Sequence, residues 1–496
     1  MDFKFDDKKE LQFIIDCLFQ ESRGDGVLYM KLNSDKLIYD VNFKEWYFWN
    51  GNYWELDDFG FHKAEVENVA RAYEICAEKI IEGRKDDEGF FKKVKIQKLF
   101  KNASYLRTSA GRNSCIDFVI RNVQIKNREN QKILHRSLDL NAHPYLLPCK
   151  NAVIDLETGE AISANPFDYM TRVMDVNYDP NFKDIPLFLQ FLKDVYNNDQ
   201  ELIRYIQMVL GHSLIGEVIE HKFFVFTGRG RNGKGVLLDL ILKMFGTFGT
   251  PIPVQLFLES SYTPNANSPT PVLLSFYGRR FILTSEAKKN KKYDTEMIKF
   301  MTGNEMIYSR SPHEKKEFVF PPSHSSFMRC NENPLADIND DAFFKRLDVV
   351  PHDIQFVAKP KGEFEKKIDF KIAQKLASEK SGILNWLLEG CQMFLKDGLF
   401  VPKAVEMASS QYKDDSDILG IHAFLEDKCI IGKENSIEFS LLYDCYVGWY
   451  QENVDKRVDK LPSNLLFGKE IRSAEKRILQ DKQNGKMYYK GVTCII

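Results

Sequence analysis

Several features that would assign a sequence to a specialised class of protein are scarce or missing among these 496 residues. The nine cysteines lie far apart and include no C-x-x-C pair, which argues against a structural zinc site and against a disulfide framework. No apolar run approaches the about 20 residues of a membrane helix, and the charged first residues argue against a signal peptide. We therefore expect a cytoplasmic protein without a membrane partner.

An excess of charge of one sign is also missing. Lys and Arg together number 69 and Asp and Glu 71, so the formal net charge is −2. No protein-wide basic field attracts nucleic acid, and any DNA contact must come from local basic patches. The length predicts about two to four domains, and we expect domains over residues 1–200, 201–395 and 396–496.

A glycine-rich loop, GRGRNGKG at residues 228–235, lies between an expected strand and an expected helix. Residues 223–226 are an apolar run that suits a buried strand, and residues 236–244 are apolar at helical spacing. Such a loop turns backbone N–H groups around a polyphosphate at a helix N-terminus, and its lysine adds a positive charge. We expect this loop to bind ATP through Gly228, Gly230, Asn232, Gly233, Lys234, Gly235 and Val236.

One position departs from the usual phosphate-binding loop, in which a Ser or Thr follows the lysine and holds Mg²⁺. Gly235 stands there and has no hydroxyl group. Water, Ser285 or Thr227 would have to complete the magnesium shell. A strand-to-helix turn that binds nothing is the alternative, but the strand before the loop and the polar residues downstream favour a nucleotide site.

Three polar residues downstream are candidates for ATP hydrolysis. The segment FILTSE is an expected strand that ends at Glu286, and we expect it to lie beside the loop's strand. There the carboxylate would polarise water and help to hold Mg²⁺. Asn331 follows the expected strand 326–330 and would orient the attacking water or sense the γ-phosphate. Arg346, before another apolar strand, is either a surface charge or an arginine finger for a neighbour's ATP, and we favour the finger.

Two basic segments are candidates for DNA contact. Alternating residues 306–310 and 317–320 flank the sequence SPHEKK, which predicts a hairpin with a basic tip. Such a tip is either a solvated turn or a grip on the DNA backbone. In the last hundred residues, helical segments precede a strand pair with an Asn484-Gly485 turn, which is typical of a winged helix. Arg472, Lys476 and Arg477 would bind DNA there, and protein docking is the alternative.

The N-terminal two hundred residues mix helical and β patterns. Residues 8–22, 64–106 and 185–215 have helical periodicity, and 41–56 form an expected hairpin around Asn50-Gly51. Trp46, Trp49 and Trp54 in that hairpin more often pack a sheet than stack bases. Asp155 and Glu157 resemble a primase metal pair, but the sequence VIDLETGEAI is better explained as a hairpin turn.

These motifs in their order resemble the superfamily 3 helicases, in the poxvirus-type branch shared by phages, plasmids and large DNA viruses. The similar segments are GRGRNGKG, FILTSE, IKFMTGNE with the hairpin after it, and FMRCNENP followed by FFKRLDVVP. Upstream, KEWYFWNGNYWE, NAVIDLETGE and VNYDPNFKDIPLFLQFL resemble that branch's N-terminal domain. Many relatives carry a primase domain, and the absence of a convincing primase acid cluster here predicts a helicase without one.

The resemblance implies an α/β fold with an AAA+ P-loop ATPase core, an α+β N-terminal domain and a C-terminal winged-helix-like domain. It implies a hexameric ring with ATP and Mg²⁺ between subunits, and single-stranded or forked DNA drawn through the pore by His313, Lys315 and Lys316. Lys234 would bind phosphate, Glu286 would activate water and Asn331 would act as the polar sensor. A separate primase or polymerase would be a partner in the host-cell cytoplasm.

Two other functions stay open. The departure at Gly235 and the single acid at Glu286 favour, as the main alternative, a nucleotide-regulated DNA-binding or origin-recognition protein with weak hydrolysis. A weaker possibility is a primase-helicase that uses Asp155 and Glu157. Measured ATP turnover with single-stranded DNA distinguishes the first alternative from a helicase, and primer synthesis tests the second.

Overall fold

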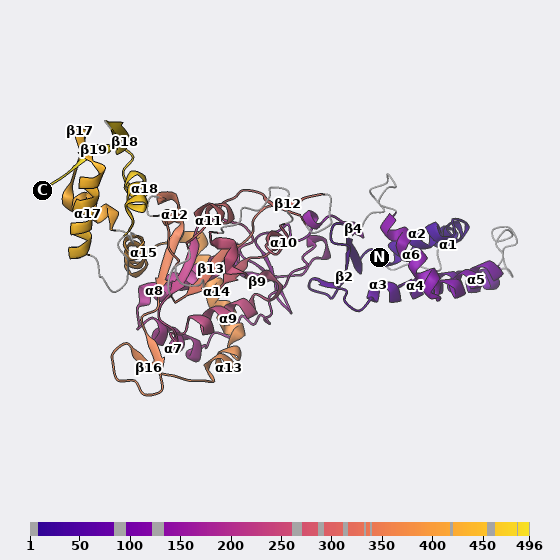
Figure 1. Cartoon of the computed structure of the whole chain (residues 1–496). Coiled ribbons are helices and arrows are strands. Elements are labelled where there is room, and N and C mark those ends of the chain that lie inside the picture. The colour runs from indigo at the N-terminus through magenta and orange to yellow at the C-terminus, as the bar shows by residue number, and fades with distance from the viewer. Residues whose placement is uncertain are drawn as a thin grey trace.

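The computed structural model describes residues 8–83, 96–121, 133–259, 270–285, 292–310, 316–331, 334–337, 340–416, 420–453, 462–483 and 485–495. Its elements form three groups along the molecule (Figure 1). N-terminal helices lie at one end, a parallel sheet with its helices lies in the middle, and a small α/β group lies at the other end. Among the helices that the structure describes, none has the length and apolar character needed to span a bilayer.

The N-terminal group joins helices to a small mixed sheet. The helices are α1 (Lys8–Phe19), α2 (Ser22–Asn33), α3 (Phe61–Ala64), α4 (Val66–Gly83), α5 (Ile96–Leu106) and α6 (Ser109–Arg121). The sheet has the order β3-β2-β1-β4, with β1 (Leu37–Asp40), β2 (Glu45–Trp49), β3 (Trp54–Leu56) and β4 (Leu134–His135). The predicted hairpin at Asn50-Gly51 is confirmed by the antiparallel pairing of β2 with β3. Trp46 and Trp54 are buried, as expected of side chains that pack a sheet.

A second hairpin precedes the parallel sheet. Strands β5 (Leu146–Pro148), β6 (Val153–Asp155) and β7 (Glu160–Ile162) form an antiparallel sheet, and Asp155 lies opposite Glu160. The Asp155 carboxylate accepts a hydrogen bond from the backbone N–H of Glu157, at 2.8 Å. The turn predicted at Glu157–Glu160 is therefore confirmed, and Asp155 organises it as Asx residues commonly do.

The central sheet has five strands, all parallel, in the order β14-β8-β13-β10-β9. They are β8 (Phe223–Thr227), β9 (Gly249–Ile252), β10 (Phe281–Thr284), β13 (Ser325–Cys330) and β14 (Leu347–Pro351). Side chains alternate between two buried cores. Phe224 and Phe226 of β8 face one core, whereas Phe223 and Val225 face the other. Burial on both faces is what a parallel sheet requires.

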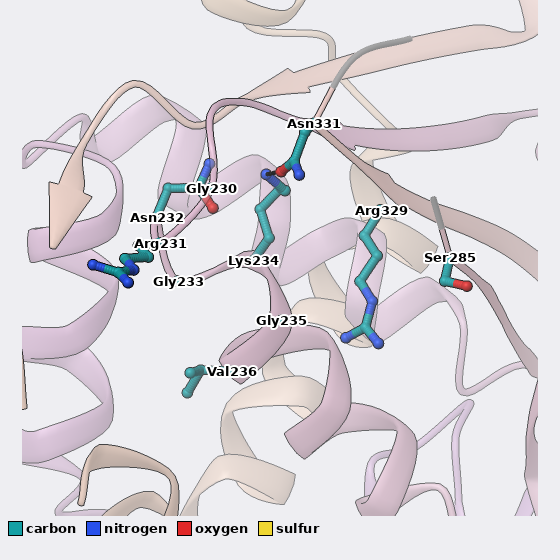
Figure 2. A pocket seen from close by; sticks show the side chains of 10 residues that line it. All are labelled: Gly230, Arg231, Asn232, Gly233, Lys234, Gly235, Val236, Ser285, Arg329 and Asn331. Carbon is teal, nitrogen blue, oxygen red and sulfur yellow. Dashed lines mark hydrogen bonds between the residues drawn. The ribbon is translucent and has the colours of Figure 1, made fainter. Parts of the chain in front are cut away.

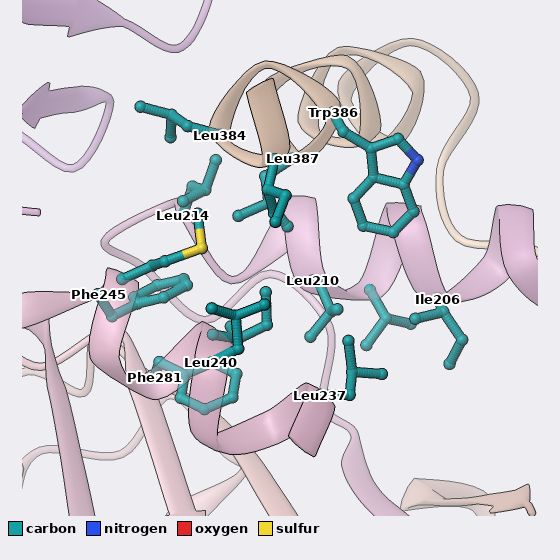
Figure 3. Close-up of a cluster of buried hydrophobic side chains, with 14 of the residues drawn as sticks. Ile206, Leu210, Leu214, Leu237, Leu240, Phe245, Phe281, Leu384, Trp386 and Leu387 are labelled. Carbon is teal, nitrogen blue, oxygen red and sulfur yellow. The ribbon is translucent and has the colours of Figure 1, made fainter. Parts of the chain in front are cut away.

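Helices cover both faces of this sheet. One core receives α7 (Pro186–Val195), α8 (Gln200–His212), α9 (Lys234–Met244), α13 (Ile372–Ala377) and α14 (Lys380–Asp397). The other receives α10 (Pro271–Leu274), α11 (Thr295–Met301) and α12 (Asp341–Arg346), with a contribution from α15 (Lys403–Asp415). In Figure 3, leucines of α14, α8 and α9 form successive layers of the first core. That core contains residues from both sides of positions 200 and 395, and the domain boundaries stay predictions.

Two short strand pairs extend from the central group. The predicted hairpin after α11 is confirmed by β11 (Ile307–Ser309) and β12 (Phe318–Phe320), which pair antiparallel. The second pair, β15 (Gln355–Val357) and β16 (Glu365–Lys367), is parallel and follows β14.

The C-terminal group contains α16 (Ile421–Lys428), α17 (Phe439–Asn453) and α18 (Asn464–Ala474). Its sheet has the order β17-β19-β18, with β17 (Cys429–Glu438), β18 (Leu479–Gln483) and β19 (Lys486–Cys494). The strand pair predicted at Asn484-Gly485 is confirmed, because Gln483 lies opposite Lys486. The sequence pattern did not predict β17. Its segment CIIGKENSIE has little period-2 alternation, and the long pairing with β19 supplies what local pattern does not.

Three buried histidines in the central group predict a loss of stability in mild acid. Burial lowers the pKa of His212 and of His324 to about 4, and that of His352 to about 3. Histidine in the unfolded chain has a pKa of about 6.5. The contribution of these three histidines to the free energy of unfolding is therefore complete above that pH and falls as the pH drops toward their folded-state pKa values. Each group steepens the slope by up to about 1.4 kcal/mol per pH unit.

Urea unfolding at neutral pH and at about pH 5 measures this effect, because unpaired carboxylates titrate mostly below that window. The exposed His143 offers a control: His143→Gln should leave the slope unchanged, whereas His352→Phe should reduce it. A free energy of unfolding that stays constant over this range would contradict the prediction.

Candidate functional site

The glycine-rich loop lies at the carboxyl edge of the central sheet. It connects the end of β8 to the start of α9, as the sequence predicted. The chain leaves β8 toward β9 on one side of the sheet and leaves β13 toward β14 on the other. In open parallel sheets, ligands bind in the crevice at such a topological switch point. The gap between the ends of β8 and β13 is therefore the place to look for a ligand.

Two positions in the loop require glycine because atoms of other segments lie too close for a Cβ atom. Gly228 has φ +147°, and a Cβ atom there would overlap the carbonyl oxygen of His352. Gly233 has φ +89°, and its Cβ would lie 2.6 Å from a methyl carbon of Val195 on α7. Both backbone conformations favour glycine. The loop is thus held against the segment after β14 on one side and against α7 on the other.

Lys234 and Asn331 meet at the centre of this edge. The Lys234 ammonium donates to the carbonyl oxygen of Gly228 at 2.6 Å and to Asn331 Oδ1 at 3.4 Å. Only 5% of Lys234 is exposed. Figure 2 shows the two side chains pointing toward each other from α9 and from the end of β13. The structure therefore brings together two residues that the sequence placed in one site from motifs almost a hundred positions apart.

Asn232 and His352 fix the rear of the loop. Asn232 is buried, and its side-chain amide donates to the His352 carbonyl oxygen at 3.2 Å. Nε2 of His352 lies 3.2 Å from the hydroxyl oxygen of Tyr196. Burial lowers the pKa of His352 to about 3, far below the ordinary value. His352 is consequently neutral and structural at physiological pH. Its ring packs against that of Phe226.

A cavity of about 620 Å³ opens in front of the loop. It is lined by Gly230, Arg231, Asn232, Gly233, Lys234, Gly235, Val236, Ser285, Arg329 and Asn331. Three of these side chains are cations, and none of the described lining residues is a carboxylate. Backbone N–H groups at the start of α9 add partial positive charge. The cavity is suited to a polyanion.

The same residues test whether the protein can hold Mg²⁺ here. Magnesium takes oxygen ligands, usually one or two carboxylates together with substrate phosphates. Gly235 supplies no oxygen, and a cation, Arg329, lies beside it. No group of three His, Cys, Asp or Glu side chains within the described ranges could hold a metal ion. The carboxylate beside Gly235, that of Asp239, is already paired with Arg329, so the described residues on this side of the cavity offer no unpaired carboxylate to a metal ion.

Arg329 is a residue of this site that the sequence patterns did not single out. It lies on β13 two positions before Asn331, and residues so spaced point to the same face of a strand. Its Nη1 atom is 2.6 Å from Asp239 Oδ1 on α9. The spacing of Arg329 from Asn331 was a usable signal, but its importance depends on the contact with α9, which no local pattern contains.

The expectation that the FILTSE strand lies beside the loop's strand is wrong. β13 separates β10 from β8, and it is β13 that carries Asn331. Sheet order depends on long-range pairing, which the periodicity of a single strand does not encode. Ser285 at the end of β10 still reaches the cavity. Glu286 lies outside the described residues, and its roles in activating water and holding Mg²⁺ stay predictions.

Arg346 lies at the opposite edge of the sheet from Lys234. It ends α12 directly before β14, and Leu347 pairs with Phe223 at the start of β8. The loop follows the other end of β8, which is five residues long, or about 17 Å. Arg346 donates from Nη1 to the carbonyl oxygen of Ala342. It is therefore too far away to serve the nucleotide of its own chain, and both a surface charge and the predicted role toward a neighbour are compatible with its position.

The candidate DNA-binding residues lie in two separate places. Lys316 is exposed next to β12, whereas His313 and Lys315 lie outside the described residues. In the C-terminal group, Arg472 is in the last turn of α18 and bonds the side chain of Gln480 at 2.6 Å.

The other two candidates, Lys476 and Arg477, are not on a helix, and their DNA-binding role stays a prediction. α18 ends at Ala474, so both residues lie in the turn after it. Glu475 stabilises that turn by accepting from the backbone and the side chain of Arg477, with an ion pair of 2.6 Å.

Comparison with known proteins relates the chain to viral replication proteins. Residues 27–197 match the family described as D5 N terminal like, which covers the three upstream segments noted in the sequence. A mimivirus protein (Acanthamoeba polyphaga mimivirus) named as a "Putative helicase" is 28% identical over 64% of this chain and 34% of its own length. A second one, from Invertebrate iridescent virus 3, is 22% identical over 82% of this chain and 47% of its own length.

Two further similarities are weaker or differently named. An African swine fever virus protein named as a "Putative primase" is 23% identical over 68% of this chain and 36% of its length. The solved C-terminal region of NrS-1 superposes with a TM-score of 0.40 at 14% identity, over 77% of this chain and 90% of that one. The chain spans about a third to a half of the curated relatives it matches. The family match and the viral relatives together support a relationship with the D5-type helicase and primase proteins of large DNA viruses.

Proposed function

We propose that the chain is an ATP-driven DNA helicase that replicates the genome of a virus, phage or mobile genetic element, in the poxvirus-type branch of superfamily 3. The observation that carries this proposal is the cavity at the carboxyl edge of the sheet, where a glycine-rich loop, Lys234 and Asn331 converge with further cations. The names of the viral relatives support it. The five-stranded parallel sheet, with the loop after an inner strand, supports an AAA+ P-loop core.

In this proposal the chain works as a ring, with six subunits as the expected number. Lys234 and the loop bind the ATP phosphates, Asn331 senses the γ-phosphate, and Arg346 of the next subunit completes the site. The hairpin β11–β12 with Lys316, and with His313 and Lys315 beyond the described residues, holds single-stranded DNA by its phosphates. The C-terminal group acts as a winged-helix-like DNA-binding module. Mg²⁺, which Glu286 would help to hold, and a separate primase or polymerase stay predictions.

ATP-dependent separation of forked DNA tests the proposal. We expect the purified protein to form a ring with ATP and to unwind a fork, with ATP turnover stimulated by single-stranded DNA. Electron microscopy with a non-hydrolysable ATP analogue and forked DNA reports assembly and threading in one experiment. Particles that remain single chains at saturating ATP and DNA would contradict the proposal, because Arg346 would then meet no nucleotide.

Replacing Arg346 should separate ATP binding from ATP hydrolysis. We expect Arg346→Ala to bind ATP normally and to lose at least about 100-fold in turnover, since arginine fingers contribute about 10³ to 10⁵. The adjacent, exposed Lys345 provides a matched control, and Lys345→Ala should retain most of the turnover. Mixing Arg346→Ala with Lys234→Ala subunits should restore part of the activity, because an intact loop then meets an intact finger. Normal turnover by Arg346→Ala alone would exclude the finger role.

A second candidate function is favoured by the composition of the cavity. Gly235 without a hydroxyl, and a described lining without a carboxylate, are the features of a site that binds ATP but hydrolyses it slowly. The chain would then be a nucleotide-regulated DNA-binding or origin-recognition protein. ATP binding of normal affinity together with undetectable turnover on single-stranded DNA would select this function. Since one relative is named as a primase, primer synthesis on a single-stranded template is the matching assay for the third possibility.

A further inference from the structure

The space beside Gly235 contains an ion pair, Arg329 with Asp239. A Cβ atom at position 235 would lie 3.5 Å from Arg329 Nη1 and 3.9 Å from Asp239 Oδ2. Asp239 is one helical turn after Gly235, so both face the same side of α9. Figure 2 shows the Arg329 side chain extending from β13 toward the first turns of α9. A fixed positive charge thus stands next to the position where the usual loop carries the hydroxyl that holds a metal ion.

The chemistry of Arg329 suits a phosphate group. A guanidinium has five N–H donors in a planar fork that matches phosphate oxygens, and it stays charged at all physiological pH values. Asp239 accepts from Nη1, and within the described part of the chain this is the only hydrogen bond of the Arg329 side chain. The other donors are free for a ligand in the cavity that Arg329 lines. The two side chains are 30% and 47% exposed, and such partly solvated ion pairs exchange partners at little cost.

We propose that Arg329 binds the polyphosphate of the nucleotide beside Gly235, oriented by Asp239, so that this chain binds ATP without a divalent metal ion. This inference rests on the proposed ATP site and adds to it a phosphate-binding residue and independence of ATP binding from a divalent metal ion. Lys234 and Arg329 would then hold the phosphates from two sides, one from α9 and one from β13. Gly235 is part of the arrangement, because a side chain there would contact the guanidinium.

Isothermal titration calorimetry with ATP, in Mg²⁺ and in EDTA, tests the inference on the full chain. We expect the dissociation constant of the unaltered protein to change by less than about threefold between the two conditions. Arg329→Gln should bind ATP at least about tenfold more weakly in EDTA, which corresponds to a loss of about 1.4 kcal/mol of binding free energy. Arg329→Lys, which keeps the charge but not the fork, should lose less. Thermal melts of both variants verify that they fold, and Arg329→Lys carries the test if Arg329→Gln does not.

Asp239→Asn distinguishes the orienting role from a metal-binding role. We expect it to bind ATP in EDTA within about threefold of the unaltered protein, because the asparagine side-chain oxygen still accepts from Arg329 and keeps it oriented. Two results would overturn the inference: equal ATP affinity of Arg329→Gln and the unaltered protein in EDTA, or binding that requires Mg²⁺ and is lost in Asp239→Asn. Failure of the ATP site itself gives a different result, namely no ATP binding by the unaltered protein in either condition.

Discussion

Lys234→Ala should reduce ATP affinity by at least about 100-fold and abolish both DNA-stimulated turnover and strand separation. Lys234 is 5% exposed, and its ammonium is held between the Gly228 carbonyl oxygen and Asn331. It is therefore positioned before the ligand arrives, and charge-assisted hydrogen bonds to phosphate contribute about 1.5 to 3 kcal/mol each. Equilibrium titration with ATP and a forked-DNA unwinding assay measure the two effects.

The same helix supplies the control for this change. Lys243 is exposed in the last turn of α9, beyond the residues that line the cavity, and Lys243→Ala should leave ATP affinity and unwinding unchanged. Unwinding that survives Lys234→Ala would show that the loop is not the motor's nucleotide site. Loss of activity in both variants would point to damage of α9 rather than to a missing phosphate contact.

Gly390→Val should prevent the central group from folding normally. Gly390 lies in α14, and a Cβ atom there would overlap the carbonyl oxygen of Gln207 in α8. Across the contact, a Cβ atom on Gly211 would lie 2.5 Å from the carbonyl carbon of Gly390. The two helix backbones touch directly, and backbone atoms cannot rotate away as side chains do. Overpacking in a core costs about 1 to 3 kcal/mol, and a backbone clash of this kind belongs at the upper end or beyond.

A helical glycine without neighbours gives the matched control. Gly448 in α17 is exposed and has nothing within 4 Å of its Cβ position, so Gly448→Ala should raise stability by up to about 1 kcal/mol through helix propensity. Thermal unfolding followed by circular dichroism compares the two variants. ATP affinity should fall with stability in Gly390→Val alone, because α8 and α14 pack over α9 in the first core. An unchanged melting temperature for Gly390→Val would contradict the close contact.

Local patterns were enough to predict the elements that carry the site. The strand, glycine-rich loop and helix at residues 223–244 each have a short-range signature of apolar period or turn residues, and so has the hairpin β11–β12. Asn331 was predicted to act at the γ-phosphate because it is a polar side chain at a strand tip, and its contact with Lys234 agrees with the rule that carboxyl ends of parallel strands meet at one edge of a sheet. These inferences need only the residues within one element and a general rule about sheets.

Long-range contacts account for what the patterns missed. In the sheet, β13 rather than β10 lies beside β8. Nothing within the segment FILTSE indicates which of these two strands is the neighbour of β8. The pairing of Arg329 with Asp239 joins a strand to a helix ninety positions away, and the contact of Gly211 with Gly390 joins two helices. Glycine in a helix and arginine in a strand are individually unremarkable choices. Their meaning comes from the partner that the fold brings to them.

One strand connects the two ends of the proposed motor within each subunit. Arg346 stands directly before β14, and His352 directly after it holds Asn232 of the loop by its carbonyl oxygen. β14 is stiffened by its pairing with β8 and by a hydrogen bond from its Val349 N–H to Ser409 of α15. In an assembled ring, a shift of Arg346 toward the neighbouring subunit's ATP would also shift His352, and with it Asn232 in the binding loop of the same subunit. ATP occupancy of successive sites in the ring would then be coupled through β14, without any change in the rest of the sheet.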